Sequence, residues 1–173
     1  MGLEVERKFL VRSGWRPDAE PGSSATPMRQ GYLAGEDGAH VTVRVRVAGA
    51  AGFLTIKGKA LRSATEPAQA LERLEFEYPI PLADAETLLG LSRTPLVEKV
   101  RYRLPHAGRV WEVDVFGGDN AGLIVAELEL SRADEPFERP PWLGLEVTQD
   151  ERYANAALAR RPYRSWAEAE RQT

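Results

Sequence analysis

Residues 3–10 read LEVERKFL, and their alternation of apolar and charged side chains decides the fold. Successive side chains of an extended strand point to opposite faces, so Glu4, Glu6 and Lys8 share one face. The apolar residues between them share the other face. This stretch therefore predicts a strand whose charged face is either a solvated outer surface or the lining of a polar channel.

The same alternation recurs along the chain. Further strands are predicted at residues 29–33, 41–47, 53–59, 73–80, 97–104, 109–116 and 123–130. Their charged faces carry Arg44, Arg46, Lys57, Glu75, Glu77, Lys99, Arg101, Arg103, Glu112, Asp114, Glu127 and Glu129. The turn signals at 106–108 and 117–120 are too short for a parallel crossover, so neighbouring strands are expected to be antiparallel.

Composition excludes several classes of function. The chain has 173 residues and a formal net charge of -3, which gives no overall attraction to nucleic acid or to a membrane surface. It has no cysteine and only two histidines, so any metal should be bound by oxygen ligands. No apolar segment approaches the roughly 18 residues of a membrane helix, and no signal peptide is recognisable. We expect a cytoplasmic protein, and its oligomeric state cannot be derived from the sequence.

Apolar stripes at helical spacing predict helices at residues 82–91 and 151–160, and a short helix closes the chain at 163–173. We expect one domain over residues 1–173, with a core at about 3–162. Eight strands with short antiparallel links favour a mainly β (α+β) fold, a closed eight-stranded antiparallel barrel with helices packed outside. The charges then face an interior that stays wet and binds ions.

The charged motifs each allow a functional and a structural interpretation. Glu4 and Glu6 could chelate a divalent cation while Lys8 contacts a phosphate oxygen, or the three could keep an exposed edge strand soluble. The paired bases of the other strands suit phosphate groups, or form a solvated basic face. Glu75 and Glu112 could equally be ion-pair partners of neighbouring arginines. Two further bases, Arg103 and Lys59, are expected near the channel mouth or outside it.

The Glu4-x-Glu6-x-Lys8 triplet resembles the ExExK signature of the CYTH superfamily, the triphosphate tunnel metalloenzymes. Other segments are similar to this family's blocks, in its order, over about residues 3–162. They are VRVR (43–46), LTIKG (54–58), LEFEY (74–78), EKVRY (98–102), WEVDVF (111–116), AELEL (126–130) and EVTQDERYAN (146–155). Two departures are Val100, where a hydroxyl residue is frequent, and Ala154, where an aromatic is common.

This resemblance implies an eight-stranded tunnel with a Mg²⁺ or Mn²⁺ site that acts on a triphosphate group. It implies metal ligands at Glu4, Glu6, Glu127 and Glu129. It implies phosphate-binding bases at Lys8, Arg44, Arg46, Lys57, Lys99 and Arg101. Catalytic roles, including the orientation of bases, water or a second cation, fall to Lys8, Lys57, Glu75, Glu77 and Asp114.

The leading hypothesis is metal-dependent hydrolysis of inorganic triphosphate to diphosphate and phosphate, with a small-molecule substrate and no nucleic-acid partner. Two alternatives stay open. One is an enzyme of organic triphosphates, such as a class IV adenylate cyclase or a nucleoside or thiamine triphosphatase. The other is a polyphosphate-binding module without turnover.

Overall fold

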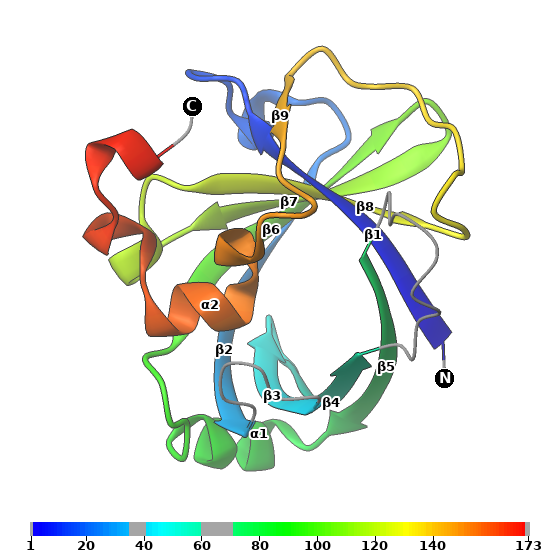
Figure 1. The fold of residues 1–173 in the computed structure, drawn as a ribbon. Helices are drawn as coiled ribbons and strands as arrows, with labels where there is room; N and C mark the ends of the chain where they lie inside the picture. The colour runs from blue at the N-terminus through cyan, green and yellow to red at the C-terminus, as the bar shows by residue number, and fades with distance from the viewer. Residues whose placement is uncertain (1, 35–40, 60–70, 172–173) are drawn as a thin grey trace.

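The fold is taken from a computed structural model, which describes residues 2–34, 41–59 and 71–171. Strands dominate it (Figure 1). They are β1 (Gly2–Val11), β2 (Ser24–Ala34), β3 (Val41–Ala48), β4 (Ala51–Lys59), β5 (Leu71–Ile80), β6 (Val97–His106), β7 (Arg109–Phe116), β8 (Ile124–Leu130) and β9 (Leu143–Glu146). The helices are α1 (Leu82–Leu89) and α2 (Asn155–Arg160), with short 3-10 helices η1 (Pro17–Ala19), η2 (Gly118–Asn120), η3 (Glu151–Tyr153), η4 (Tyr163–Ser165) and η5 (Glu168–Glu170).

The described strands form one antiparallel sheet in the order β5-β4-β3-β2-β6-β7-β8-β1-β9. In addition, β5 pairs with β1, which lies near the opposite end of that order. The predicted mainly β, antiparallel architecture with few helices is therefore confirmed. No helix within the described ranges is long and apolar enough to cross a membrane.

The apolar faces of the strands carry three clusters of buried side chains. The first lies between the sheet and the C-terminal segments and includes Val97, Phe116 and Leu158. The second backs β1, β7 and β8 and is built around Trp111. Burial of these apolar faces away from water supplies the main driving force for folding, and it leaves the charged faces directed to the inner side of the curved sheet.

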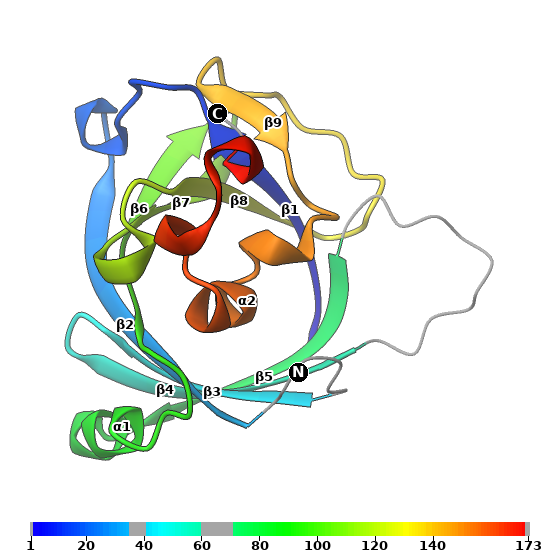
Figure 2. The same ribbon diagram turned by 60° about the vertical axis from the view of Figure 1, so that its left-hand side comes forward.

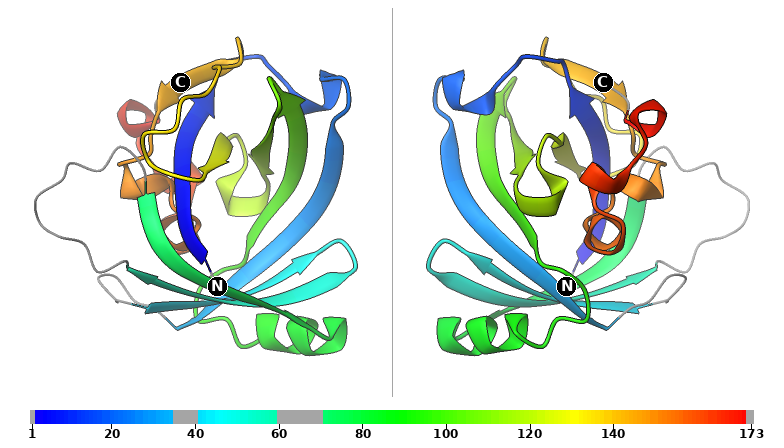
Figure 3. Two further views of the ribbon diagram at one scale, coloured as in Figure 1. Left: turned by 90° about the vertical axis from the view of Figure 1, so that its right-hand side faces the viewer. Right: turned by 90° about the vertical axis from the view of Figure 1, so that its left-hand side faces the viewer.

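Helix α1 covers the outer side of β3 and β4, where Ala85 and Leu89 pack against Val45 and Val47 (Figure 3). At Gly52 in β4, an added Cβ would lie 2.6 Å from the Cβ of Ala85, so only glycine allows the helix to approach the sheet this closely. The expectation that helices pack outside the sheet is correct for α1.

That expectation is wrong for α2. In Figure 2 the helix lies within the outline of the curved strands, and Ala154 to Ala156 line the cavity on the inner side of the sheet. The predicted helix at 151–160 is also divided, because Ala154 has an extended backbone between η3 and α2. Asp150 caps η3, accepting a hydrogen bond from the backbone N–H of Arg152. Helical periodicity predicts which side chains of this segment are buried, but it does not predict whether they pack on the outer or the inner side of the sheet.

Three other segments differ from the expectation. Strand β2 begins at Ser24 instead of residue 29, because Pro27 is accommodated opposite Val100 of β6. Strand β9 was not predicted. The expected helix at 163–173 is replaced, within its described part, by η4 and η5, because buried Trp166 packs against Tyr153 and Tyr163 and is held extended.

Candidate active site

The charged strand faces line a cavity of about 820 Å³. Among the described residues that line it, six are cationic and six carry carboxylates. They are Lys8, Arg44, Arg46, Lys57, Arg101 and Arg103, and Glu6, Glu75, Glu77, Glu112, Glu127 and Glu129. The alternation in the sequence therefore brings charges of both signs from seven strands to the lining of one cavity.

Strand register places opposite charges next to one another. Lys8 lies opposite Glu127 in the β1–β8 pair, and Arg101 lies opposite Asp114 in the β6–β7 pair. Residues directly opposite in an antiparallel pair have Cβ atoms about 5 Å apart, close enough for their charged groups to meet. The cavity wall is thus built from ion pairs that the sheet itself aligns.

Lys8 is the centre of the carboxylate group predicted to bind metal. Its Nζ lies 2.5 Å from Glu127 Oε1 and 3.2 Å from Glu6 Oε1. Burial lowers the pKa of Lys8, but the carboxylates of Glu127 and Glu6 outweigh burial and raise it above its ordinary value, so the ammonium stays charged. The same contact with Lys8 helps to hold the pKa of Glu127 well below its usual range, despite burial.

Glu6 and Glu129 lie directly opposite each other on β1 and β8, and both line the cavity. Glu4 lies two residues before Glu6 on the same strand, opposite Arg73 of β5, and its side chain is outside the described part of the structure. Among the side chains that are described, no group of three metal-ligating residues is placed to hold a metal ion.

Asp114 is the most completely buried carboxylate of the set, with a side chain 1% exposed. Arg101 binds it through two hydrogen bonds of 2.7 Å, and Lys99 Nζ also pairs with it. Burial would raise the pKa of Asp114, but Arg101 and Lys99 together lower it. Lys99 also donates to Asn155 Oδ1 at 3.3 Å and does not line the cavity.

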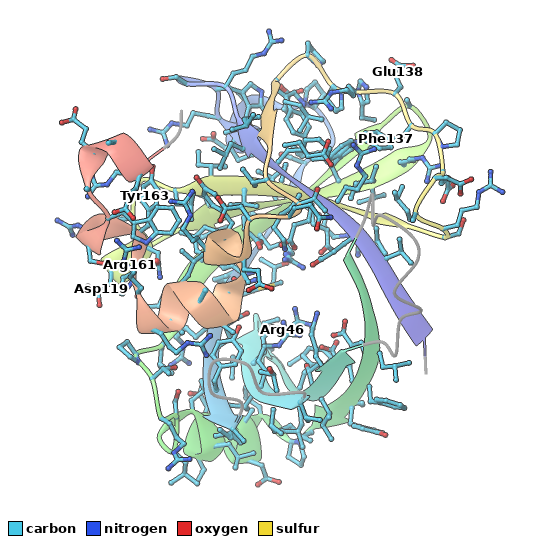
Figure 4. All side chains as sticks on the ribbon, in the orientation of Figure 1. Arg46, Asp119, Phe137, Glu138, Arg161 and Tyr163 are labelled. Atoms are coloured by element: carbon cyan, nitrogen blue, oxygen red, sulfur yellow. The ribbon has the colours of Figure 1, made fainter. Side chains whose placement is uncertain are left out.

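The bases of β3 share one carboxylate. Glu77 accepts hydrogen bonds from Arg44 (3.2 Å), from Arg46 (2.9 Å) and from the Thr55 hydroxyl (2.8 Å). Burial would raise the pKa of Glu77, but Arg46, the Thr55 hydroxyl and Arg44 outweigh it and lower the pKa. Figure 4 shows the Arg46 side chain directed from β3 to the inner side of the sheet.

These two arginines share Glu77, and Glu75, the other carboxylate near Arg44, also pairs with Lys57. Burial lowers the pKa of Arg46, the neighbouring Arg44 lowers it further, and Glu77 offsets the effect only in part. The Nε atoms of Arg44 and Arg46 are also buried without a hydrogen-bond acceptor in the described structure. Buried donors without partners are costly, so this part of the cavity is suited to an anion.

The structural interpretation of Glu75 and Glu112 as ion-pair partners is confirmed. Glu75 lies 3.0 Å from Lys57 Nζ and 3.5 Å from Arg44, and Glu112 pairs with Arg101. Both acids nevertheless line the cavity, so ion pairing and a place in the site are compatible.

Three residues in the cavity or beside it were not assigned a role from the sequence. Thr55 is buried between Arg44 and Glu77, at a same-face position two residues before Lys57. Tyr32 lines the cavity and accepts a hydrogen bond from Gln30, and burial raises its pKa to about 12. Asn155 reaches the cavity from α2. Only Thr55 follows from strand alternation; the other two depend on how distant segments meet.

A family model described as the CYTH domain matches residues 2–163, which is nearly the whole chain. The chain belongs to the CYTH domain family. The resemblance of the ExExK triplet and its companion segments is therefore confirmed at the level of the family. CYTH relatives supply the comparisons that bear on function.

Two such relatives are inorganic triphosphatases. That of Acetivibrio thermocellus is 39% identical over 169 residues, which cover 97% of this chain and all of the relative. That of Nitrosomonas europaea is 39% identical over 160 residues, covering 90% of this chain and 96% of the relative. The crystal structure of an inorganic triphosphatase superimposes with a TM-score of 0.63 at 34% identity, covering 92% of this chain and 95% of the other.

Proposed function

We propose that this CYTH protein hydrolyses inorganic triphosphate to diphosphate and phosphate with a divalent cation, Mg²⁺ or Mn²⁺. The observation that carries the proposal is the cavity lining, in which cations with buried, unpartnered N–H groups adjoin a separate group of carboxylates. The oxygen atoms of a triphosphate would accept hydrogen bonds from these N–H groups. A divalent cation would supply positive charge next to the carboxylates.

We infer that the sheet closes into an eight-stranded tunnel. The pairing of β5 with β1 supports this, with five residue pairs in register from Gly2 opposite Glu75 to Glu6 opposite Leu71. Strand β9 then lies outside the ring, paired only with β1 among the described strands. A closed wall is needed for bases on β3 and acids on β8 to act on one small ligand.

The proposed metal ligands are Glu6 and Glu129, with Glu4 and Glu127 beside them. Their donor set is made of carboxylate oxygens, which hard divalent cations prefer, and Glu6 and Glu129 are aligned across two strands. When bound, the cation would neutralise phosphate oxygens and so lower the cost of bringing a polyanion next to carboxylates. Lys8, held protonated between Glu6 and Glu127, would add a fixed positive charge at the same place.

The bases of β3 and β4 would bind the phosphate chain. Arg44 and Arg46 offer guanidinium groups suited to paired hydrogen bonds, and Lys57 offers a point charge. Glu75 and Glu77 would hold these bases in position before substrate arrives. Water attacks the terminal phosphorus, the bond to the bridging oxygen breaks, and diphosphate departs; the bases stabilise the charge on the transferred group.

The lining favours an inorganic over an organic triphosphate. Tyr32 is the only aromatic residue among the described lining residues, and it is 6% exposed. A nucleobase or thiazolium ring commonly stacks on aromatic side chains in its binding site, and this cavity offers almost no such surface.

The test is a substrate panel. Release of phosphate from tripolyphosphate, ATP and thiamine triphosphate is compared with Mg²⁺, with Mn²⁺ and with a chelator, together with an assay for cyclic AMP. We expect tripolyphosphate to be the preferred substrate and the chelator to abolish turnover. Preference for an organic triphosphate would contradict the proposal, as would tight tripolyphosphate binding without product.

A further inference from the structure

Asn155 is a neutral residue in a cavity lined mainly by charged side chains, and a helix places it there. It is the first residue of α2, which Figure 2 shows within the outline of the curved strands. Leu158 and Ala159 of the same helix are buried in the first apolar cluster, which fixes α2 against the sheet. Asn155 lines the cavity with Ala154 and Ala156, and it is the one residue of these three with a polar side chain.

Asn155 connects the cavity to a buried base. The side chain of Lys99 is 1% exposed and pairs with Asp114, and its Nζ donates a hydrogen bond of 3.3 Å to Asn155 Oδ1. Lys99 does not line the cavity, so its ammonium group does not reach a ligand there directly. Asn155 contacts this ammonium group and also lines the cavity, so a ligand meets the amide of Asn155 and not the charge of Lys99.

The contact with Lys99 determines how the Asn155 amide is oriented. Burial lowers the pKa of Lys99 to about 8, against the opposing effect of Asp114, so the group is still protonated at neutral pH. A protonated lysine has only donors, so the amide atom that faces it is the acceptor Oδ1 and not the donor Nδ2. Within the described structure Nδ2 makes no hydrogen bond, and it is not among the buried atoms that lack a partner. Its N–H groups are therefore available to a ligand in the cavity.

An anion is the ligand that suits this arrangement. The ammonium group on the amide oxygen polarises the amide, which makes its N–H groups better donors. Hydrogen bonds to a charged acceptor such as a phosphate oxygen are stronger than those between neutral groups. The amide also brings a donor without a second formal charge, so it needs no carboxylate partner that a ligand must displace.

We propose that Asn155 is a phosphate-binding residue, whose amide NH2 group donates to an oxygen of the bound triphosphate while Lys99 holds its carbonyl oxygen. The proposal rests on the proposed function, because it assumes that a triphosphate occupies the cavity. It makes Lys99 a positioning residue that acts through Asn155. Helix α2 then contributes a substrate contact of its own, in addition to those of the strands.

The experiment compares Asn155→Ala and Asn155→Asp with wild type. N155A removes both the donor and the contact with Lys99. N155D keeps an oxygen that pairs with Lys99, but it replaces the NH2 group by a second acceptor oxygen. The affinity of the full chain for tripolyphosphate is measured by calorimetry without divalent cation. Gln149→Glu makes the same exchange of amide for carboxylate at an exposed residue outside the cavity lining, and is the matched control.

We expect N155A to bind tripolyphosphate roughly tenfold more weakly than wild type, the size of effect given by the loss of one hydrogen bond to a charged group. N155D should bind more weakly still, because its carboxylate repels the phosphate oxygens. Its melting temperature should nevertheless equal or exceed that of N155A, because the contact with Lys99 is kept. Q149E should bind tripolyphosphate as wild type does.

Wild-type affinity in N155D would overturn the proposal, because it would show that Asn155 only holds Lys99 in place. Wild-type affinity in N155A, an equal loss in Q149E, or the absence of tripolyphosphate binding by wild type would overturn it as well. Phosphate release with Mg²⁺ is measured separately on the same preparations. Weaker binding by both Asn155 variants without turnover by wild type would refute hydrolysis and retain the phosphate contact. Turnover by wild type with unchanged affinity in both variants would do the reverse.

Discussion

Two walls line the cavity, and they are built differently. The buried wall consists of β6, β7, β8 and β1, and its innermost pair, Lys99 and Asp114, is 1% exposed at each side chain. The half-exposed wall consists of β3, β4 and β5, where Lys57 is 21% and Glu77 is 30% exposed, although Arg44 and Arg46 are only 10% and 13% exposed. Two large apolar clusters back the buried wall, whereas the half-exposed wall is covered by α1 and a small cluster around Val45.

The difference in burial between the two walls indicates which ion pairs can be broken and re-formed with a ligand. A buried ion pair that loses one member leaves an uncompensated charge at low dielectric, so the buried wall is fixed once folded. Pairs nearer to water contribute little to stability and can be broken at small cost. We therefore expect the buried wall to hold the architecture and the metal ligands, and the half-exposed wall to release its bases to the substrate.

The largest expected effect is on the stability of the buried wall. Asp114→Asn removes the carboxylate that Arg101 and Lys99 share, and should lower the free energy of unfolding by about 3–5 kcal/mol. Denaturant titration measures it. Glu77→Gln makes the matching change in the half-exposed wall and should cost about 1 kcal/mol or less. Equal losses in the two variants would show that the walls do not differ.

The next effect separates catalysis from stability. Glu6→Gln removes a proposed metal ligand while keeping shape and hydrogen bonding, and should lower kcat/KM for tripolyphosphate by at least about 100-fold. Glu98→Gln, an exposed acid of β6 outside the cavity lining, is the control and should behave as wild type. Near-normal metal-dependent turnover of E6Q would refute the metal assignment.

A smaller effect tests the half-exposed wall as the phosphate-binding side. Arg46→Lys keeps the positive charge but loses the planar guanidinium group, which can make two parallel hydrogen bonds to a phosphate. It should raise KM for tripolyphosphate about tenfold, with little change in the free energy of unfolding. Arg29→Lys alters an arginine that pairs with Glu86 outside the cavity, and serves as the control. If R46K loses stability and retains its KM, then Arg46 is structural.

The smallest effect concerns the outer support of the buried wall in acid. Glu135 accepts hydrogen bonds from Arg109 and from Ser131, which lower its pKa from 4.5 to about 2. Because the folded-state pKa is depressed, the stabilisation is present above pH 4.5 and is lost as the pH falls toward about 2. Thermal melts of wild type and Glu135→Gln should therefore differ most near neutral pH and converge in acid. A gap that stays constant across this range would contradict the assigned contacts.

Alternation in the sequence was sufficient to predict most strands and the charged set that lines the cavity. Strand β9 was missed because its four residues are too few for a pattern, and its pairing with β1 joins Phe9 to Glu146 across most of the chain. The position of α2 was missed for a related reason. The periodicity of Leu158 and Ala159 identifies a buried face, while the surface that buries it is set by the whole fold.

The sequence predicts which charged residues belong to the site, but it does not predict which of them pair with one another. Lys99 and Arg101 have the same pattern in the sequence, yet Lys99 is held by Asp114 and Asn155 away from the cavity and Arg101 reaches it. Which base is buried depends on strand register and on the arrival of α2, and neither is encoded within a single strand. The pairing of Glu112 is a similar case. Strand register places it opposite Arg103, but its carboxylate pairs with Arg101.

The most direct measurement is a crystal structure with tripolyphosphate and Mn²⁺, using the anomalous signal of manganese to locate the metal. We expect manganese between Glu6 and Glu129 on the buried wall, and phosphate oxygens on Arg44, Arg46 and Lys57 of the half-exposed wall. Tripolyphosphate on the outer surface, or manganese away from these carboxylates, would contradict the division of labour between the two walls.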